Sequence, residues 1–125
     1  MKFITLLFFL CFATYTQSQT DCAKFKTGTF VLPDDVISKR YLIKRTKTKQ
    51  KEEDMITGDK FTFEVRWLDS CTYALRPLKG NKDMLEYFAG KILYITINST
   101  TEDQYTFFSR FENEAGVSGT MVKIK

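Results

Sequence analysis

Histidine is absent from this 125-residue chain. Imidazole is the commonest general base near neutral pH and the commonest metal ligand, so His-assisted serine or cysteine nucleophiles are excluded. Proline occurs twice and glycine six times, which fits neither a disordered nor a collagen-like protein. With 43% hydrophobic and 15% aromatic residues, the composition predicts one small folded domain. We expect no enzymatic activity, no bound metal and no cofactor.

Long apolar runs are also missing beyond the N-terminus. Lys2 is followed by an apolar run from Phe3 to Ala13, a pattern typical of a secretory signal peptide and too short for a spanning helix. Thr16 and Ser18 are small residues that predict cleavage before Gln19. We therefore expect a signal peptide at 1–18, a single domain at 19–125 without a transmembrane segment, and export to the periplasm or outside the cell. An uncleaved N-terminal anchor is the alternative.

Cysteine is scarce as well. Cys11 lies in the signal peptide, which leaves Cys22 and Cys71 as an even pair in an oxidising compartment. Their spacing excludes a CxxC redox pair and predicts a disulfide that closes a loop of about 50 residues. Two buried free thiols are the alternative.

The clearest positive signal is an alternation with period two. Apolar residues occupy positions 61, 63, 65 and 67, and after a turn at 68–70 they occupy 71, 73 and 75, which predicts a hairpin. Weaker runs predict further strands at 24–31, 40–46, 50–56, 91–98, 104–111 and 119–125. The short connections favour antiparallel neighbours.

One segment, at 82–89, has helical instead of strand periodicity. Asn81 is a suitable N-cap, Gly90 is a suitable residue after the helix end, and Met84, Leu85 and Phe88 share one face. We expect a short helix that buries these three side chains against the sheet.

These elements predict an all-β fold, an antiparallel meander of about eight strands with one short helix. Closure into a lipocalin-like barrel would remove the exposed edges; a rolled sheet or a two-sheet sandwich is the alternative. Gly28-Thr29-Phe30 resembles the Gly-x-aromatic start of lipocalin-like barrels. Lys123 occupies the last strand, where those barrels carry an arginine.

The chain is also similar to a group of small exported proteins from Bacteroidetes, mainly flavobacteria, which have no established activity. The resemblance rests on Cys22-x-x-Phe25-x-x-Gly28-x-Phe30, Ile43-Lys44-Arg45, Gln50-x-Glu52 and Val65-Arg66-Trp67-Leu68-Asp69-Ser70-Cys71-Thr72-Tyr73-x-Leu75. Lys51 replaces an expected apolar residue, which would leave that strand more exposed. Members sometimes carry a DNA topoisomerase IV label, but an exported domain of 125 − 18 = 107 residues lacks the size for strand passage.

Two functional hypotheses follow. In the first, the domain binds a small apolar or amphipathic ligand, with candidate contacts from Arg45, Phe63, Trp67, Tyr73, Phe88 and Phe107, and Phe111 as a further apolar wall. The alternative is that these side chains only fill the core.

In the second hypothesis, a basic hairpin at 39–51 contacts an anionic envelope surface. Its candidate residues are Lys44, Lys47, Lys49 and Lys51. An ordinary solvated surface is the alternative. The chain has no nucleic-acid recognition motif, so we do not expect nucleic acid as a partner.

Overall fold

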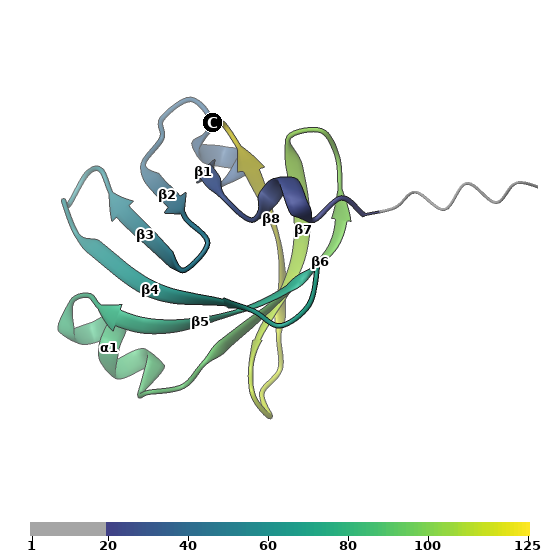
Figure 1. Cartoon of the computed structure of the whole chain (residues 1–125). Coiled ribbons are helices and arrows are strands. Elements are labelled where there is room, and N and C mark those ends of the chain that lie inside the picture. The colour runs from purple at the N-terminus through teal and green to yellow at the C-terminus, as the bar shows by residue number, and fades with distance from the viewer. Residues whose placement is uncertain (1–19) are drawn as a thin grey trace, which may run out of the picture.

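Eight antiparallel strands pair in sequence order, and the last pairs with the first to close a barrel (Figure 1). This computed structural model describes residues 20–125, so the predicted signal peptide lies outside the described residues. The elements are η1 (Ala23–Phe25), β1 (Gly28–Val31), η2 (Pro33–Asp35), β2 (Tyr41–Arg45), β3 (Lys49–Asp54), β4 (Lys60–Trp67), β5 (Thr72–Lys79), α1 (Lys82–Phe88), β6 (Leu93–Thr100), β7 (Gln104–Phe111) and β8 (Val117–Lys123).

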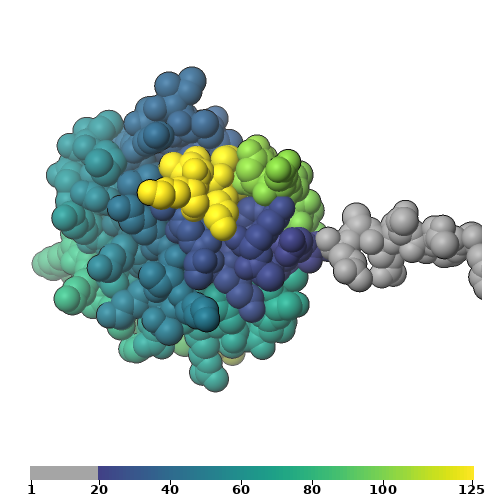
Figure 2. All heavy atoms as spheres, turned by 45° about the horizontal axis from the view of Figure 1, so that its top comes forward, coloured from purple at the N-terminus to yellow at the C-terminus, as the bar shows by residue number. Residues whose placement is uncertain are grey.

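Closure of the barrel depends on the pairing of β1 with β8. Phe30 lies opposite Lys123, and Val31 lies opposite Val122. The same contact appears from outside in Figure 2, where the yellow C-terminal residues lie against the purple N-terminal segment. The backbone N–H of Thr29 donates to the carbonyl of Lys125 at 2.8 Å. The predicted barrel is confirmed, and the rolled sheet and the sandwich are not observed.

The first strand is shorter than predicted. Ala23–Phe25 forms a 3-10 helix, and the strand begins only at Gly28, where φ is 139°. A Cβ at Gly28 would come within 2.7 Å of Lys123 Cε, so glycine allows the lysine side chain to cross the strand. Lys123 Nζ then donates to the carbonyl of Lys24 at 2.6 Å. This bond ties η1 to the last strand.

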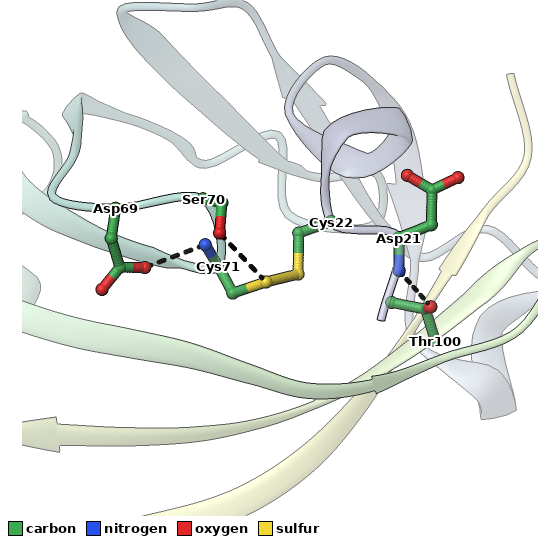
Figure 3. The surroundings of a disulfide bond; sticks show 6 residues. All are labelled: Asp21, Cys22, Asp69, Ser70, Cys71 and Thr100. Carbon is green, nitrogen blue, oxygen red and sulfur yellow. Dashed lines mark hydrogen bonds between the residues drawn. A yellow bond between two sulfur atoms is a disulfide. The ribbon is translucent and has the colours of Figure 1, made fainter. Parts of the chain in front are cut away.

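The end of the barrel beside η1 is closed. Phe25 is fully buried there, and its ring packs edge-to-face against Tyr105 with centroids 5.2 Å apart. The predicted disulfide is confirmed: Cys22 and Cys71 are bonded, with Cα atoms 5.3 Å apart (Figure 3). It joins η1 to the turn between β4 and β5. The 3-10 segment is therefore held from both sides and plugs this end.

The short helix α1 forms as predicted. Asn81 Oδ1 accepts a hydrogen bond from Met84 N at 2.8 Å, and the chain leaves the helix through Ala89, whose φ is 49°. Phe88 is buried and Met84 is partly buried against the core, whereas Leu85 is 40% exposed. The expectation that Leu85 is buried was wrong, because the two-turn helix contacts the barrel through a narrower face than its apolar pattern predicted.

Candidate functional site

Arg45 lies in the barrel interior and connects four elements. Its Nε donates to Gln50 Oε1 at 2.7 Å, and its Nη1 donates to the carbonyl of Phe25 at 2.9 Å. Its Nη2 donates to the hydroxyls of Tyr73 at 3.0 Å and Tyr105 at 2.9 Å. All three nitrogen atoms are therefore satisfied inside the protein, and the residue is only 3% exposed.

Aromatic rings complete the surroundings of the guanidinium. Its central carbon lies 4.6 Å from the ring centroid of Phe30 and 4.5 Å from that of Tyr73, which are cation–π distances. Burial lowers the pKa of Arg45, but its interactions with Tyr73, Tyr105 and Glu52 outweigh that effect and raise it. Arg45 is thus a buried permanent cation.

The two tyrosine hydroxyls also contact each other. Tyr73 Oη lies 3.1 Å from Tyr105 Oη, so one of them donates to the other. Desolvation raises the pKa of Tyr73 well above its usual value of 10.0, although the charge of Arg45 acts in the opposite direction. Tyr73 therefore stays neutral and serves as a hydrogen-bonding partner for the guanidinium.

The network continues from Arg45 toward the other end of the barrel. Gln50 accepts from Arg45 through Oε1 and donates from Nε2 to Glu52 Oε1 at 3.1 Å. The alternation of β3 points both side chains inward. Desolvation raises the pKa of Glu52 above its usual value of 4.5, although Gln50 and Arg45 lower it.

Glu52 reaches a hollow of about 330 Å³ at the end of the barrel opposite η1. We call this hollow the mouth pocket. Its lining residues are Leu32, Tyr41, Ile43, Glu52, Glu53, Asp54, Phe61 and Met121. The wall is mostly apolar, and Ile43 and Phe61 lie directly opposite Glu52 on the two neighbouring strands. Leu32 and Tyr41 are 37% and 38% exposed at its edge.

The second acidic side chain in the wall has its own partners. Asp54 Oδ1 accepts from the backbone N–H groups of Ile56 at 2.9 Å and Thr57 at 3.3 Å, and Asp54 Oδ2 lies 3.6 Å from Arg40 Nη2. These bonds lower the pKa of Asp54. Asp54 therefore stabilises the turn that follows β3. Glu52 does not bond to this turn.

The loops beside the mouth pocket carry exposed apolar side chains. Ile37 is 96% exposed, Ile56 73% and Met55 54%. These residues belong to the β1–β2 and β3–β4 connections, which are joined by a hydrogen bond from Met55 N to the carbonyl of Arg40 at 2.7 Å.

The candidate ligand residues from the sequence lie together, but deeper than the mouth pocket. Tyr73 contacts Arg45, and its ring packs at a tilt of 45° against Trp67 with ring centroids 4.7 Å apart. The ring of Phe63 packs on the ring of Phe88 with centroids 5.4 Å apart.

Phe107 also packs against its neighbours. Its ring centroid lies 5.9 Å from that of Tyr105, and its ring fills the space above Gly119, where a Cβ would come within 2.5 Å of it. Phe111 contacts Phe88 at 5.3 Å. These side chains pack as core, and within residues 20–125 other residues line the mouth pocket.

Sequence reasoning missed most of the pocket wall. The alternation of β3 could have placed Glu52 inside, because Gln50 and Glu52 share the face that pairs with Arg45. Leu32 and Met121 carried no such signal, since they meet only when β1 and β8 pair.

The candidate basic residues lie on the outer face of the same strands. Lys44 and Lys51 are directly opposite each other on β2 and β3, and Lys49 lies opposite Glu64. Lys47 is in the exposed turn between the two strands. Lys51 is exposed, as the departure from the resembled pattern had suggested.

The described residues contain neither a metal-binding cluster nor a membrane-spanning helix. Between residues 20 and 125, no three histidine, cysteine, aspartate or glutamate side chains are grouped as they would be around a metal ion. In the same part of the chain, no helix combines the length and apolarity needed to cross a membrane.

Comparisons with known proteins returned nothing for this chain: no family model, no curated protein and no solved structure matches it.

Proposed function

We propose that this protein is a non-catalytic binding module that takes a small amphipathic ligand in the mouth pocket. The observation that carries the proposal is the combination of a mostly apolar hollow of about 330 Å³ with the partly buried carboxylate of Glu52 in its wall. Small-molecule sites commonly have volumes of roughly 300–1,000 Å³ and a mostly apolar lining with a few polar groups. The apolar chain of a ligand would contact Ile43, Phe61 and Met121, and its polar end would reach Glu52.

The barrel supports such a module because its two ends differ. The disulfide and the hydrogen bond from Arg45 to the carbonyl of Phe25 hold the end beside η1 closed, which leaves the opposite end for a ligand. The polar network reaches the pocket wall through the hydrogen bond from Gln50 to Glu52, which orients Glu52 before a ligand arrives. A preformed site avoids the free-energy cost of ordering side chains on binding.

Decanol, an uncharged amphiphile, tests the proposal by isothermal titration calorimetry. We expect saturable binding at one site with a negative heat-capacity change, since apolar surface is buried. Leu32→Trp would place an indole at the edge of the pocket and weaken binding at least tenfold. Leu68→Trp is the matched control, because Leu68 is a similarly exposed leucine in the turn after β4. Absence of binding, or equal loss in both variants, would contradict the proposal.

A second candidate function rests on a different observation, a transverse row on the outer face of the barrel. The paired positions Thr29, Lys44, Lys51, Thr62 and Lys79 run across five strands without a carboxylate. Within residues 20–125, neither Lys44 nor Lys51 forms an ion pair. Like charges held opposite each other are unfavourable, so an anionic envelope surface would relieve the repulsion.

Vesicle sedimentation tests this second candidate. Replacement of Lys44, Lys51 and Lys79 with Gln should abolish association with anionic vesicles at low salt. The same loss of charge at Arg66, Lys82 and Lys91, three exposed basic residues elsewhere, should leave association intact. Exposed charges are screened over about 8 Å at physiological salt, so association should weaken as salt rises. Equal binding by both triple variants would contradict the candidate.

A further inference from the structure

The polar groups of the mouth pocket are unevenly distributed by charge. Within residues 20–125, its wall includes the acidic residues Glu52, Glu53 and Asp54 and no basic residue. Asp54 is engaged by backbone N–H groups and Arg40. Glu53 lies opposite Lys60 on the outer face of the barrel. Glu52 is therefore the acidic group left to meet a ligand.

Glu52 has unused hydrogen-bonding capacity on the pocket side. Its Oε1 accepts from Gln50, while its Oε2 forms no hydrogen bond with any residue between 20 and 125. In that same range, the buried side-chain nitrogen and oxygen atoms without a partner are Arg40 Nε and Trp67 Nε1. Glu52 Oε2 is not among them, so it is not fully buried, and Glu52 belongs to the lining of the mouth pocket. An ionised carboxylate offers about four acceptor positions and no donor.

Arg45 does not compete for the same ligand group. Each of its nitrogen atoms already donates inside the barrel, and three aromatic rings surround its guanidinium. Arg45 is not part of the pocket lining, so an anionic ligand in the mouth pocket would meet the carboxylate of Glu52, which has the same sign of charge, and, within residues 20–125, no basic side chain of the wall. A ligand that donates hydrogen bonds would meet an accessible acceptor.

From this geometry we infer that the ligand of the mouth pocket carries a positively charged amine at its polar end, which donates to Glu52 Oε2. This inference rests on the proposed function and specifies the class of ligand: a primary amine joined to an apolar chain. The ammonium group would supply the cationic partner that Glu52 reaches only indirectly, through Gln50. Charge-assisted hydrogen bonds of this kind are about twice as strong as neutral ones.

Three probes with the same alkyl chain separate the contribution of the polar end from that of the apolar chain. They are decylamine, decanol and decanoate, titrated at about pH 8 below the concentrations at which they form micelles. We expect the wild-type protein to bind the amine about tenfold more tightly than the alcohol, as one charged hydrogen bond implies. Decanoate should bind most weakly. A Met121 methyl shift in the NMR spectrum would place each probe in the mouth pocket.

Two variants assign the preference. Glu52→Gln retains the shape and removes the charge, so it should bind the amine and the alcohol equally. Glu102→Gln is the matched control, because Glu102 is an exposed glutamate in the β6–β7 turn, and the preference for the amine should persist. Circular dichroism verifies folding. If Glu52→Gln does not fold, the order of the three probes on the wild-type protein still decides.

The outcomes separate this inference from the proposed function. Equal binding of amine and alcohol by the wild-type protein, or tightest binding of decanoate, would overturn the amine inference and leave a pocket that binds amphiphiles. A preference for the amine that survives in Glu52→Gln would also overturn it. Failure of all three probes to bind would overturn the proposed function as well.

Discussion

The guanidinium of Arg45 and the hydroxyl of Tyr105 are 2.9 Å apart in the barrel interior, although 60 residues separate them in the chain. The bond links β2 to β7 across the interior, where cross-strand pairing does not reach. A buried charge is tolerated only when it is well hydrogen-bonded, and Arg45 meets this condition through four acceptors. The network therefore connects the plug at η1, through the carbonyl of Phe25, with Glu52 in the wall of the mouth pocket, through Gln50.

A double-mutant cycle tests this network. Tyr73→Phe and Tyr105→Phe each remove a hydroxyl that accepts from the same Nη2 atom and contacts the other hydroxyl. Each single change should lower the free energy of unfolding by about 1.5–3 kcal/mol, as expected for a bond to a charged group. The double change should depart from the sum by at least about 0.5 kcal/mol. Tyr87→Phe, at an exposed tyrosine, is the control. Additive effects in urea denaturation would contradict a shared network.

The disulfide is expected to contribute strongly to stability. Cys22 and Cys71 are 49 residues apart. Replacement of both by Ser should lower the free energy of unfolding by about 4 kcal/mol, because the unfolded chain gains the entropy of the opened loop. Equilibrium urea denaturation measures the change, and a loss of less than about 1 kcal/mol would contradict it.

Helix α1 is expected to be part of the core. Phe88 is 7% exposed and packs between two other rings. Its ring centroid lies 5.4 Å from that of Phe63 and 5.3 Å from that of Phe111. Phe88→Ala should lower the free energy of unfolding by about 3 kcal/mol or more. Leu85→Ala, on the exposed side of the same helix, should change it by no more than about 0.5 kcal/mol. If thermal melts of the two variants coincide, the helix does not pack as described.

Glu52 is expected to make stability depend on pH. Its pKa is raised in the folded state, so between its usual value of 4.5 and the folded value the native protein binds more protons than the unfolded chain. The contribution of Glu52 to the free energy of unfolding is complete below pH 4.5, and it is lost as the pH rises through the pKa that Glu52 has in the folded protein. Glu52→Gln lacks this loss, so the variant should gain stability relative to the wild-type protein over that window.

Denaturation at a series of pH values tests the prediction. Arg45, whose charge acts on Glu52, is common to both proteins. Asp54 and Asp69 have lowered pKa values, so the stability that each carboxylate contributes is lost as the pH falls. This loss is the same in both proteins. The difference between the two curves therefore isolates Glu52. A constant difference, or one of opposite sign, would contradict the prediction.

The sequence was sufficient for the architecture because local patterns specify it. The alternation from Phe61 to Leu75 predicted the β4–β5 hairpin, and the cysteine pair predicted the disulfide. The helix cap at Asn81 was equally local. Residues 24–27 were assigned to a strand in error, because the plug that they help to form depends on contacts with Lys123 and Tyr105, which are distant in the chain.

The mouth pocket depends on barrel closure and could not be predicted in the same way. Leu32 and Met121 become neighbours only through the register of β1 on β8. Arg45 was singled out as a possible charged anchor for a ligand, whereas its contacts place it in an internal network. A charged residue in an alternating strand does not itself indicate whether its partners belong to the protein or to a ligand.

Methyl NMR spectra recorded during titration with decanol show whether the mouth pocket binds an amphipathic ligand. We expect saturable shifts of the Ile43 and Met121 methyl signals, which belong to the pocket wall, and no shift of the Ile97 methyl signals, because Ile97 is in the core and does not line the pocket. Saturation should leave the spectrum of the remaining core intact. Shifts spread evenly over exposed methyl groups, or no shift at Met121 and Ile43, would show that the mouth pocket does not bind the amphiphile.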